Sequence, residues 1–521
     1  MSHRATVLNL PRSPARAHAA SGLSRRTFLR GGAASVAALA LLGERLLADP
    51  YAARAAGPTA VTPVRIRGRV SAAGRPVPNA GVSDGITVVA TGADGRFELI
   101  SGTGRGFVSL IPPPGYALPT AETGTLRLHR PIVPDGSGEM RADFALAPAP
   151  GDENHAFLVL ADPQTQDEYE MGRFHAETVP DVQATVSTLG LPCFGVGCGD
   201  LMFDRLDLFP EYERAVSRTG IPFCQVVGNH DLDQDGASDA ASVVTFSRHF
   251  GPNRYAFNRG NVHYVVLDDV FWHGADYLGH VDGEQLEWLA ADLARVERGG
   301  TVVVFLHIPV YTSISSREEG SARPDYKVAV TNREALYRLL EPYRAHIYSG
   351  HTHESDHIYE GGVHEYTVGA VCGAWWSGDI CYDGTPNGYG VFEVRGEEIR
   401  GRYKATGQPA AHQLRAYSRG ADPTAPEEIV ANVWNWDPAW TVVWYQGADR
   451  RGAMARRTGL DPLSVAQHLG PDLPERRKWV DPVRTDHMFY APVAAGATDL
   501  RVEAVDGWGG RYEQPVRGEE P

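Results

Sequence analysis

Hydrophobic and polar positions follow three different patterns along the chain, and the first predicts a small β-domain. Between residues 57 and 150, short β-type runs are separated by turns rich in glycine, proline and aspartate. Strands at this spacing, with no helical period, are typical of a β-sandwich. Because Pro148 and Pro150 lack a backbone donor, they favour a domain boundary at about residue 150. The clearest strand candidates are Val64 to Val70, Ile86 to Thr91 and Phe97 to Ile100.

The second pattern, from residue 151 to 400, alternates short apolar runs with segments of helical period. Glu284 to Val296 and Asn332 to Leu340 carry apolar residues three or four positions apart, as amphipathic helices do. Uniformly apolar runs are expected for strands that are covered on both faces. The pattern therefore predicts an α/β domain, with strands at Ala156 to Ala161, Phe194 to Gly197, Phe223 to Val227, Val262 to Leu267, Thr301 to Leu306 and His346 to Ser349.

The third pattern, from residue 403 to 521, returns to β-type runs rich in tryptophan, tyrosine and valine. Trp440 to Tyr445, Met488 to Pro492 and Leu500 to Val505 are separated by turn signals such as Asp506 and Gly507. These runs predict a second β-rich domain at the C-terminal end.

The first 55 residues form a separate segment that resembles a twin-arginine export signal. Arg25 and Arg26 precede an apolar run from Gly31 to Gly43, and residues 53–55 offer a small-residue cleavage site. The apolar run is shorter than the roughly 20 residues needed to span a bilayer, so no stable membrane anchor is expected. The alternative is a short core helix behind a basic tail. The resemblance implies export of a folded protein, with a periplasmic, cell-envelope or secreted location.

Charge and cysteine content narrow the function classes. The 521-residue chain has 49 basic and 64 acidic residues, and removal of residues 1–55 takes away eight arginines and two acids, which leaves 41 basic against 62 acidic residues. A protein this acidic is not expected to bind nucleic acid or anionic lipid non-specifically. The five cysteines lack CxxC spacing, which argues against a zinc cage or a disulfide framework. A single disulfide between Cys372 and Cys381 stays open, since exported proteins can hold one.

Metal-binding residue types follow the ends of the predicted α/β strands. Taken alone, Asp162 could cap a helix and Asp200 could sit in a turn. Taken together, carboxylate, amide and imidazole groups at several strand ends suit a pair of divalent cations. The residues concerned are Asp162, Gln164, Asp200, Asn229, His230, Asp231, His307, His351 and His353.

Between about Ala156 and Gly369 the chain resembles the calcineurin-like metallophosphoesterase family. The resemblance rests on DxQ at Asp162, GD at Gly199, GNHD at Gly228, the lone His307 and GHTH at Gly350. It implies a two-sheet αββα sandwich that holds two metals, here flanked by N-terminal and C-terminal β-sandwich-like domains. The first metal would be held by Asp162, Gln164, Asp200 and His353, and the second by Asp200, Asn229, His307 and His351.

Gln164 stands where most members of the family place histidine. The DPQ form resembles the subgroup of calcineurin-like phosphoesterase-domain-containing proteins. An amide oxygen is a harder and weaker donor than imidazole, so the two divalent ions are expected to be Mn, Fe or Mg, with Zn possible.

The chemistry expected of such a centre is hydrolysis of a phosphate ester. Two adjacent cations lower the pKa of a bridging water and clamp the phosphate, so that a metal-bridging hydroxide attacks in line. His230 would protonate the leaving oxygen, and Asp231 would orient its ring. The resemblance to the DPQ subgroup favours phosphate monoesters, from small or macromolecular substrates. The alternatives are a phosphodiesterase acting on nucleotide, lipid-headgroup or cell-wall phosphates, and a catalytically inactive surface binding protein.

Three further features allow more than one interpretation. Asp231 to Gly236 resembles the start of a calcium loop, but Ser242 replaces the glutamate expected at the twelfth position, which favours a polar loop. Trp272 and His273 could form a wall of the cleft. Trp375, Trp376 and Tyr382 are candidates either for a substrate platform or for covering a hydrophobic flank.

Overall fold

The computed structural model describes residues 62–317 and 325–516, apart from the side chain of Ser315. The predicted export signal and its cleavage site lie outside these residues. Within the described ranges, no helix is both long enough and apolar enough to cross a bilayer.

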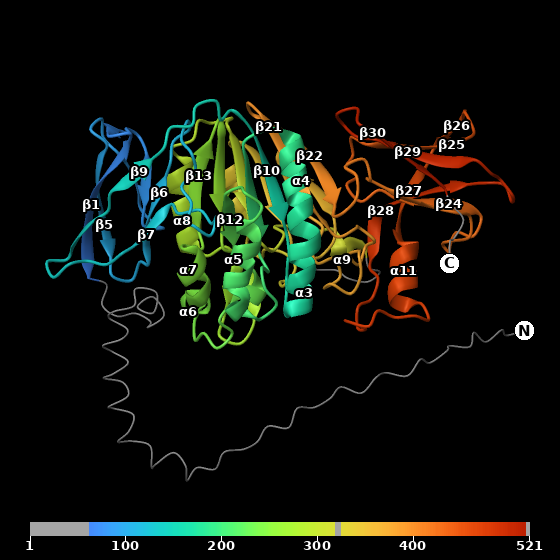
Figure 1. The fold of residues 1–521 in the computed structure, drawn as a ribbon, viewed down its shortest axis with the longest axis horizontal. Helices are drawn as coiled ribbons and strands as arrows, with labels where there is room; N and C mark the ends of the chain where they lie inside the picture. Colours follow the sequence, from blue (N-terminus) through green and yellow to red (C-terminus); the bar gives the residue numbers. More distant parts are fainter. Residues whose placement is uncertain (1–61, 318–324, 517–521) are drawn as a thin grey trace, which may run out of the picture. The chain divides into compact units, whose positions relative to one another are not determined.

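Two sheets form the centre of the fold, and they lie between layers of helices (Figure 1). In the first sheet β10, β11 and β12 run parallel, and β21 pairs antiparallel with β10. Its order is β12(Phe223–Val226), β11(Cys193–Cys198), β10(Asn154–Leu160), β21(Gly388–Arg395) and β22(Glu398–Ala405). The order of the second is β13(Tyr255–Arg259), β14(Val262–Val266), β17(Thr301–Phe305), β18(Arg344–Ser349), β20(Val363–Thr367) and β19(Asp356–Glu360).

Aromatic side chains fill the space between the two sheets. The Phe157 ring of β10 lies 4.8 Å from the Phe392 ring of β21 and 5.3 Å from the Tyr348 ring of β18, centroid to centroid. All three side chains are almost completely buried. The residues on the inner faces of both sheets belong to one hydrophobic cluster. The strands therefore need apolar residues on the face between the sheets as well as on the face beneath the helices, which explains their uniformly apolar sequences.

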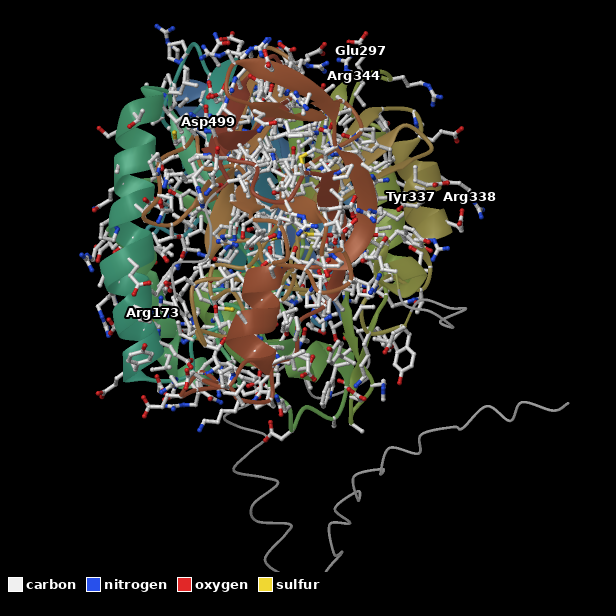
Figure 2. All side chains as sticks on the ribbon, turned by 90° about the vertical axis from the view of Figure 1, so that its right-hand side faces the viewer. Arg173, Glu297, Tyr337, Arg338, Arg344 and Asp499 are labelled. Atoms are coloured by element: carbon white, nitrogen blue, oxygen red, sulfur yellow. The ribbon has the colours of Figure 1, made fainter. Side chains whose placement is uncertain are left out.

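Helices cover the outer face of each sheet. On the first sheet lie α3(Glu168–Arg173), α4(Val179–Leu189) and α5(Phe209–Ser217), with α6(Asp239–Ser242) and α7(Val244–Phe250) nearby. On the second lie α8(Gly283–Leu293) and α10(Arg333–Leu340), whose apolar faces join the cluster around Trp288, while α9(Ile314–Arg317) lies near β28(Arg484–Pro492). The charged side chains of Arg338 in α10 and of Glu297, in the loop after α8, are exposed (Figure 2). The αββα sandwich is therefore confirmed.

The N-terminal part is a pair of small sheets around their own core. Val64, Ile66 and Leu110 lie in this core, and alternate residues of β1 face it, as expected for a half-buried strand. One sheet holds β1(Pro63–Ala72), β2(Arg75–Pro76), β5(Arg96–Gly102), β8(Glu139–Arg141) and β9(Phe144–Leu146). The other holds β3(Gly81–Ser83), β4(Val88–Ala90), β6(Phe107–Ile111) and β7(His129–Pro131).

The C-terminal part is also built from two sheets, and a short helix accompanies them. Trp440, Val442 and Phe489 lie in the core between these sheets. One sheet has the order β23(Arg415–Tyr417), β24(Glu428–Asn432), β28, β27(Ala455–Leu460), and α11(Pro462–Leu469) follows β27. The other has the order β26(Asp449–Ala453), β25(Thr441–Gln446), β29(Leu500–Val505), β30(Arg511–Pro515). The two flanking β-domains are thus confirmed, whereas the central sandwich reaches Ala405 and extends beyond the predicted residue 400.

Candidate metal centre

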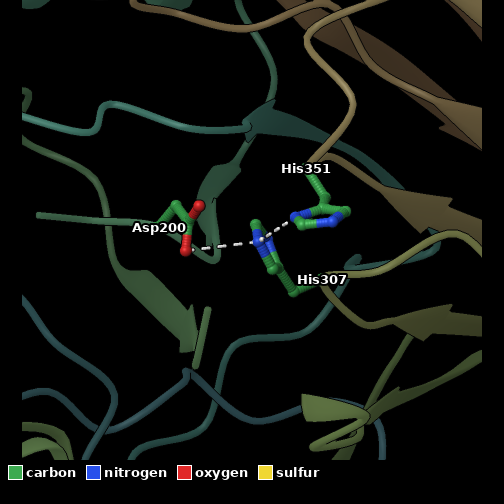
Figure 3. A group of neighbouring side chains, drawn as sticks. All are labelled: Asp200, His307 and His351. Carbon is green, nitrogen blue, oxygen red and sulfur yellow. Dashed lines mark hydrogen bonds and ion pairs between the residues drawn. The ribbon is translucent and has the colours of Figure 1, made fainter. Parts of the chain in front are cut away.

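The seven predicted ligands lie at one end of the two central sheets, in loops that directly follow β10, β11, β12, β17 and β18. One ligand atom each from Asp200, His307 and His351 lies within 4.8 Å of the others (Figure 3). The His307 Nε2 atom is 3.3 Å from Asp200 Oδ1, 3.2 Å from Asn229 Oδ1 and 3.2 Å from His351 Nδ1. These four residues are those assigned to the second metal, and their donor atoms converge.

The remaining ligands adjoin this group through Asp200 and His351. Gln164 Nε2 donates to Asp200 Oδ2 over 3.2 Å, and His353 Nε2 lies 3.5 Å from Asp162 Oδ1. The Asp162 carboxylate also accepts the backbone N–H of His351 at 2.9 Å. Asp200 therefore lies between the two predicted sets, where the residue shared by both metals is expected.

Backbone carbonyl groups fix which ring nitrogen of each histidine faces the centre. His307 Nδ1 lies 3.0 Å from Cys198 O, His351 Nε2 lies 2.8 Å from Lys327 O, and His353 Nδ1 lies 2.6 Å from Gly373 O. Since a carbonyl oxygen only accepts, these nitrogens carry the protons. When the rings are neutral, the opposite nitrogens direct lone pairs toward one another and toward the Asp162 carboxylate, an arrangement that favours a positive charge between them.

The electrostatics of the centre lead to the same requirement. Burial disfavours a charged His307 ring, yet the carboxylates of Asp200 and Asp162 outweigh it and raise the His307 pKa to about 10. Burial likewise opposes ionisation of Asp200, but the surrounding imidazoles hold the pKa of that carboxyl well below its ordinary value. A cation is favoured here, and a divalent ion would displace the proton from His307. The donor set fits the expected metals.

Left-handed backbone conformations are concentrated at the ligands. Asp162, Gln164, Asp200, His351 and His353 have φ angles of 50°, 41°, 47°, 71° and 52°. Residues other than glycine adopt this region at a cost of about 1–3 kcal/mol each, and such residues cluster at functional sites. The loops are therefore shaped for ligand placement at the expense of local stability.

The glycines of the three motifs allow these loops to approach each other. A Cβ atom on Gly199 would lie 2.1 Å from His307 Nδ1, and one on Gly228 would lie 1.9 Å from the Asp200 nitrogen. A Cβ on Gly350 would lie 2.4 Å from Asp162 Oδ2. Each motif thus pairs a metal ligand with a glycine that makes room for a ligand from another loop.

His230 adjoins the metal ligands, but the residue that holds its ring is Asp204 and not Asp231. The His230 backbone N–H donates to Asp200 Oδ1 over 2.8 Å, and its ring Nδ1 lies 2.8 Å from Asp204 Oδ1. The Phe203 ring meets the His230 ring edge to face at 4.4 Å. The role predicted for Asp231 is therefore wrong. Asp204 was not predicted from the sequence, because the only sequence signal for it is its position four residues after Asp200.

Asp231 has a structural role instead. Its buried carboxylate accepts the backbone N–H groups of Leu201, Met202 and Gly228 at 2.9–3.0 Å, and so it ties the GD loop to the GNHD loop. Burial and the neighbouring Asp200 raise its pKa to about 7. A side chain turned inward in this way does not serve as the first ligand of a calcium loop, and the polar-loop interpretation of residues 231–242 is the one that the structure supports.

Of the aromatic candidates, Trp375 and Tyr382 lie beside a metal-ligand candidate, whereas Trp376 and Trp272 make structural contacts. The Trp375 ring is 4.8 Å and the Tyr382 ring 5.6 Å from the His353 ring. Trp376 is buried, and its Nε1 donates to Pro163 O over 2.9 Å, which supports its role in covering a hydrophobic flank rather than in a substrate platform. Trp272 donates from Nε1 to Gly236 O and supports the polar loop rather than a cleft wall.

Cys372 is a second residue near the ligands that the sequence did not indicate. Its thiol lies 3.7 Å from both Gln164 Oε1 and His353 Nδ1. Cys372 and Cys381 are both buried free thiols, so the structure does not contain the disulfide considered for them. Burial raises the pKa of each thiol well above its ordinary value, which keeps both neutral.

Comparison with known proteins gives three matches along the chain. Residues 64–149 match the N terminal of calcineurin-like phosphoesterase, residues 194–355 match calcineurin-like phosphoesterase, and residues 365–512 match the C terminal of calcineurin-like phosphoesterase. The central match includes the ligand candidates from Asp200 to His353, while Asp162 and Gln164 precede it.

Relatives with phosphatase names share parts of the sequence. Purple acid phosphatase 15 of Arabidopsis thaliana is 29% identical over 144 residues, which are 26% of this chain and 24% of that protein. Serine/threonine-protein phosphatase CPPED1 of Homo sapiens is 26% identical over 239 residues, which are 43% of this chain and 70% of that protein. The chain thus matches about a quarter of the first relative and seven tenths of the second.

A solved structure, that of purple acid phosphatase PPD1 from yellow lupin (Lupinus luteus) seeds, aligns with a TM-score of 0.37 and 13% identity, over 63% of this chain and 58% of that one. The three family matches follow one another in the expected order and cover both flanking domains and the centre of the sandwich. The chain therefore belongs to the calcineurin-like phosphoesterases, a family of metal-dependent phosphoric ester hydrolases, and carries their N-terminal, catalytic and C-terminal domains.

Proposed function

We propose that this protein hydrolyses phosphate monoesters with two divalent cations held by the seven ligand residues. The observation that carries the proposal is the set of imidazole nitrogens directed at one another and at Asp162, with the other nitrogen of each ring fixed by a backbone carbonyl. When bound, two such cations supply a water of lowered pKa and neutralise charge on the phosphate. The harder amide donor of Gln164 favours Mn, Fe or Mg.

The chain itself supplies the acid for the leaving group. Asp204 holds Nδ1 of His230, and Phe203 lies edge to face with the ring, so the ring is fixed with Nε2 as its remaining polar atom. In this arrangement Nε2 donates a proton to the departing oxygen, and the Asp204 carboxylate stabilises the ring while it is charged. Asp204 is a positioning residue in this scheme, since its contact is with His230.

A preference for monoesters over diesters is supported by the names of the relatives. Those that match are called purple acid phosphatase and serine/threonine-protein phosphatase. The DPQ form at Asp162 to Gln164 supports the same choice. The alternative functions, a phosphodiesterase and an inactive binding protein, are distinguished from a phosphomonoesterase by the experiment below.

The first experiment compares a nitrophenyl phosphate with its bis-nitrophenyl diester, after chelation and after addition of Mn, Mg, Fe or Zn. The proposal expects metal-dependent hydrolysis of the monoester at a kcat/KM at least tenfold higher. Faster diester hydrolysis would show a phosphodiesterase. Stoichiometric metal without turnover of either compound would show a binding protein.

The acid role of His230 is tested with leaving groups of different basicity. In His230→Ala, hydrolysis of an alkyl phosphate should fall by about 10²–10⁴-fold, whereas nitrophenyl phosphate, whose leaving group needs little protonation, should lose much less. The metal content should stay unchanged, because His230 is not a ligand. Equal losses for both substrates would remove His230 as the acid.

We also propose export through the twin-arginine pathway, on the basis of Arg25 and Arg26 before the apolar run. Residues 1–55 fused to a folded reporter should direct it out of the cytoplasm, and replacing both arginines by lysine should stop this. A reporter that stays in the cytoplasm with the intact segment contradicts the proposal.

A further inference from the structure

A segment of the C-terminal domain reaches the metal loops. Residues 470–483, here called the arm, connect α11 to β28. Arg477 Nη2 donates to Gln166 Oε1 and to Glu170 Oε1, both over 2.9 Å, and Arg476 Nη2 donates to Glu170 Oε1 over 2.9 Å and to Asp167. Glu170 is completely buried, so these charge-assisted bonds compensate a carboxylate that would otherwise be costly. The arm is therefore firmly docked beside the loop that carries Gln164.

The arm also meets the residues around the proposed acid. The Arg477 guanidinium lies over the Phe203 ring at 5.1 Å, and Phe203 is the residue that packs against His230. Arg477 has a φ of 55°, a left-handed conformation that is uncommon for a residue other than glycine. Five of the seven metal-ligand candidates share this left-handed conformation.

Trp479 extends from the arm toward the other side of the centre. Its ring centroid lies 4.4 Å from that of Trp375, and the Trp375 ring lies 4.8 Å from the ring of His353. Trp479 is 57% exposed. A large exposed aromatic ring that continues a row of rings leading to a metal ligand has the features of a stacking surface.

We propose that Trp479 together with Trp375 stacks against the flat organic group of the substrate, so that the C-terminal domain selects aryl or heterocyclic phosphate esters. This inference rests on the proposed function, because the stacked group is the one attached to the phosphate at the metal centre. The arginine contacts hold Trp479 in place, and Trp375 links it to His353. Esters with small aliphatic groups receive no such contact.

The test compares 1-naphthyl phosphate with glycerol 2-phosphate in wild-type protein and in Trp479→Ala. We expect KM for the naphthyl ester to rise about five- to tenfold, the effect of losing one aromatic contact. KM for the glycerol ester should change less than twofold, and Trp479→Phe should retain most of the wild-type KM for the naphthyl ester. Trp508→Ala is the matched control, since Trp508 is 52% exposed in the same domain, where it packs beneath Arg400.

Binding of a naphthylmethyl phosphonate, measured by calorimetry on metal-loaded protein, separates this inference from the proposed function. Weaker binding in Trp479→Ala but not in Trp508→Ala supports the stacking role, even if no substrate is turned over. Unchanged phosphonate binding, or equal changes in KM for both esters, would overturn it. Absence of turnover in the wild type would count against the proposed function alone.

Discussion

Replacing Gly228 by alanine gives a direct test of how closely the ligand loops approach one another. Gly228 has a φ of −110°, which alanine adopts freely, so backbone strain at this residue does not contribute. The added Cβ would lie 1.9 Å from the Asp200 nitrogen and 2.3 Å from Asp200 Oδ1. The nitrogen belongs to the main chain, and Oδ1 is held in place because it also accepts the His230 backbone N–H.

The expected cost of Gly228→Ala follows from this overlap. Overpacking of a well-packed interior costs typically about 1–3 kcal/mol of unfolding free energy, and a clash with backbone belongs at the upper end. Displacement of Asp200, which lies between the two ligand sets, should also remove most of the bound metal and most of the activity. Urea denaturation of the metal-free protein and metal analysis of the reconstituted protein measure the two effects separately.

Gly172→Ala is the matched control. Gly172 lies in α3, and no heavy atom lies within 4 Å of its added Cβ. Alanine in a helix is favoured over glycine by up to about 1 kcal/mol, so this variant should be slightly more stable and should bind metal normally. If Gly228→Ala keeps wild-type stability within about 0.5 kcal/mol and retains its metal, the steric argument for all three motif glycines is refuted.

Three further results are expected. Asp204→Ala should lower kcat about 10- to 100-fold with little change in metal content, because it frees the His230 ring; an unchanged kcat would deny Asp204 its positioning role. Burial, helped by Arg259, lowers the His155 pKa to about 4. The His155 side chain therefore takes up a proton near pH 6.5 in the unfolded chain but not in the folded one, so the free energy of unfolding falls as the pH drops from 6.5 to 4. His155→Gln should reduce this fall by up to about 3 kcal/mol, measured by urea denaturation at each pH. An equally steep fall in the variant would contradict the pKa assigned to His155. Native protein should react with no thiol reagent and denatured protein at five positions, whereas three reactive thiols on denaturation would reveal a disulfide.

The sequence predicted the sandwich and the clustering of ligands because both depend on local patterns. Uniform apolar runs marked β10, β11, β12, β14, β17 and β18 to within about two residues at each end. The ligands follow those strands directly, so their convergence followed from sheet geometry. The strands β21 and β22 were not predicted from the sequence. The pairing of β21 with β10 joins residues more than 200 positions apart, which local patterns do not reveal.

The errors concern contacts that adjacent positions do not reveal. Asp231 follows His230 in sequence, but the turn at residues 229–231 directs its carboxylate to the backbone of Leu201 and Met202. Asp204 replaces it because a left-handed turn with a φ of 58° brings its carboxylate back to the His230 ring. Trp375 and Trp376 are neighbours with opposite environments, and only the folded backbone distinguishes them.

The docking of the arm on Glu170 has a thermodynamic consequence for the whole enzyme. Glu170 also accepts the backbone N–H of Gln166, two residues from Gln164, so one carboxylate joins the first metal loop to two arginines of the C-terminal domain. If this carboxylate couples ion capture to domain attachment, each strengthens the other by the same free energy. The C-terminal domain would not be a dispensable appendage: its excision would weaken ion affinity at a distance, and chelation would loosen its attachment.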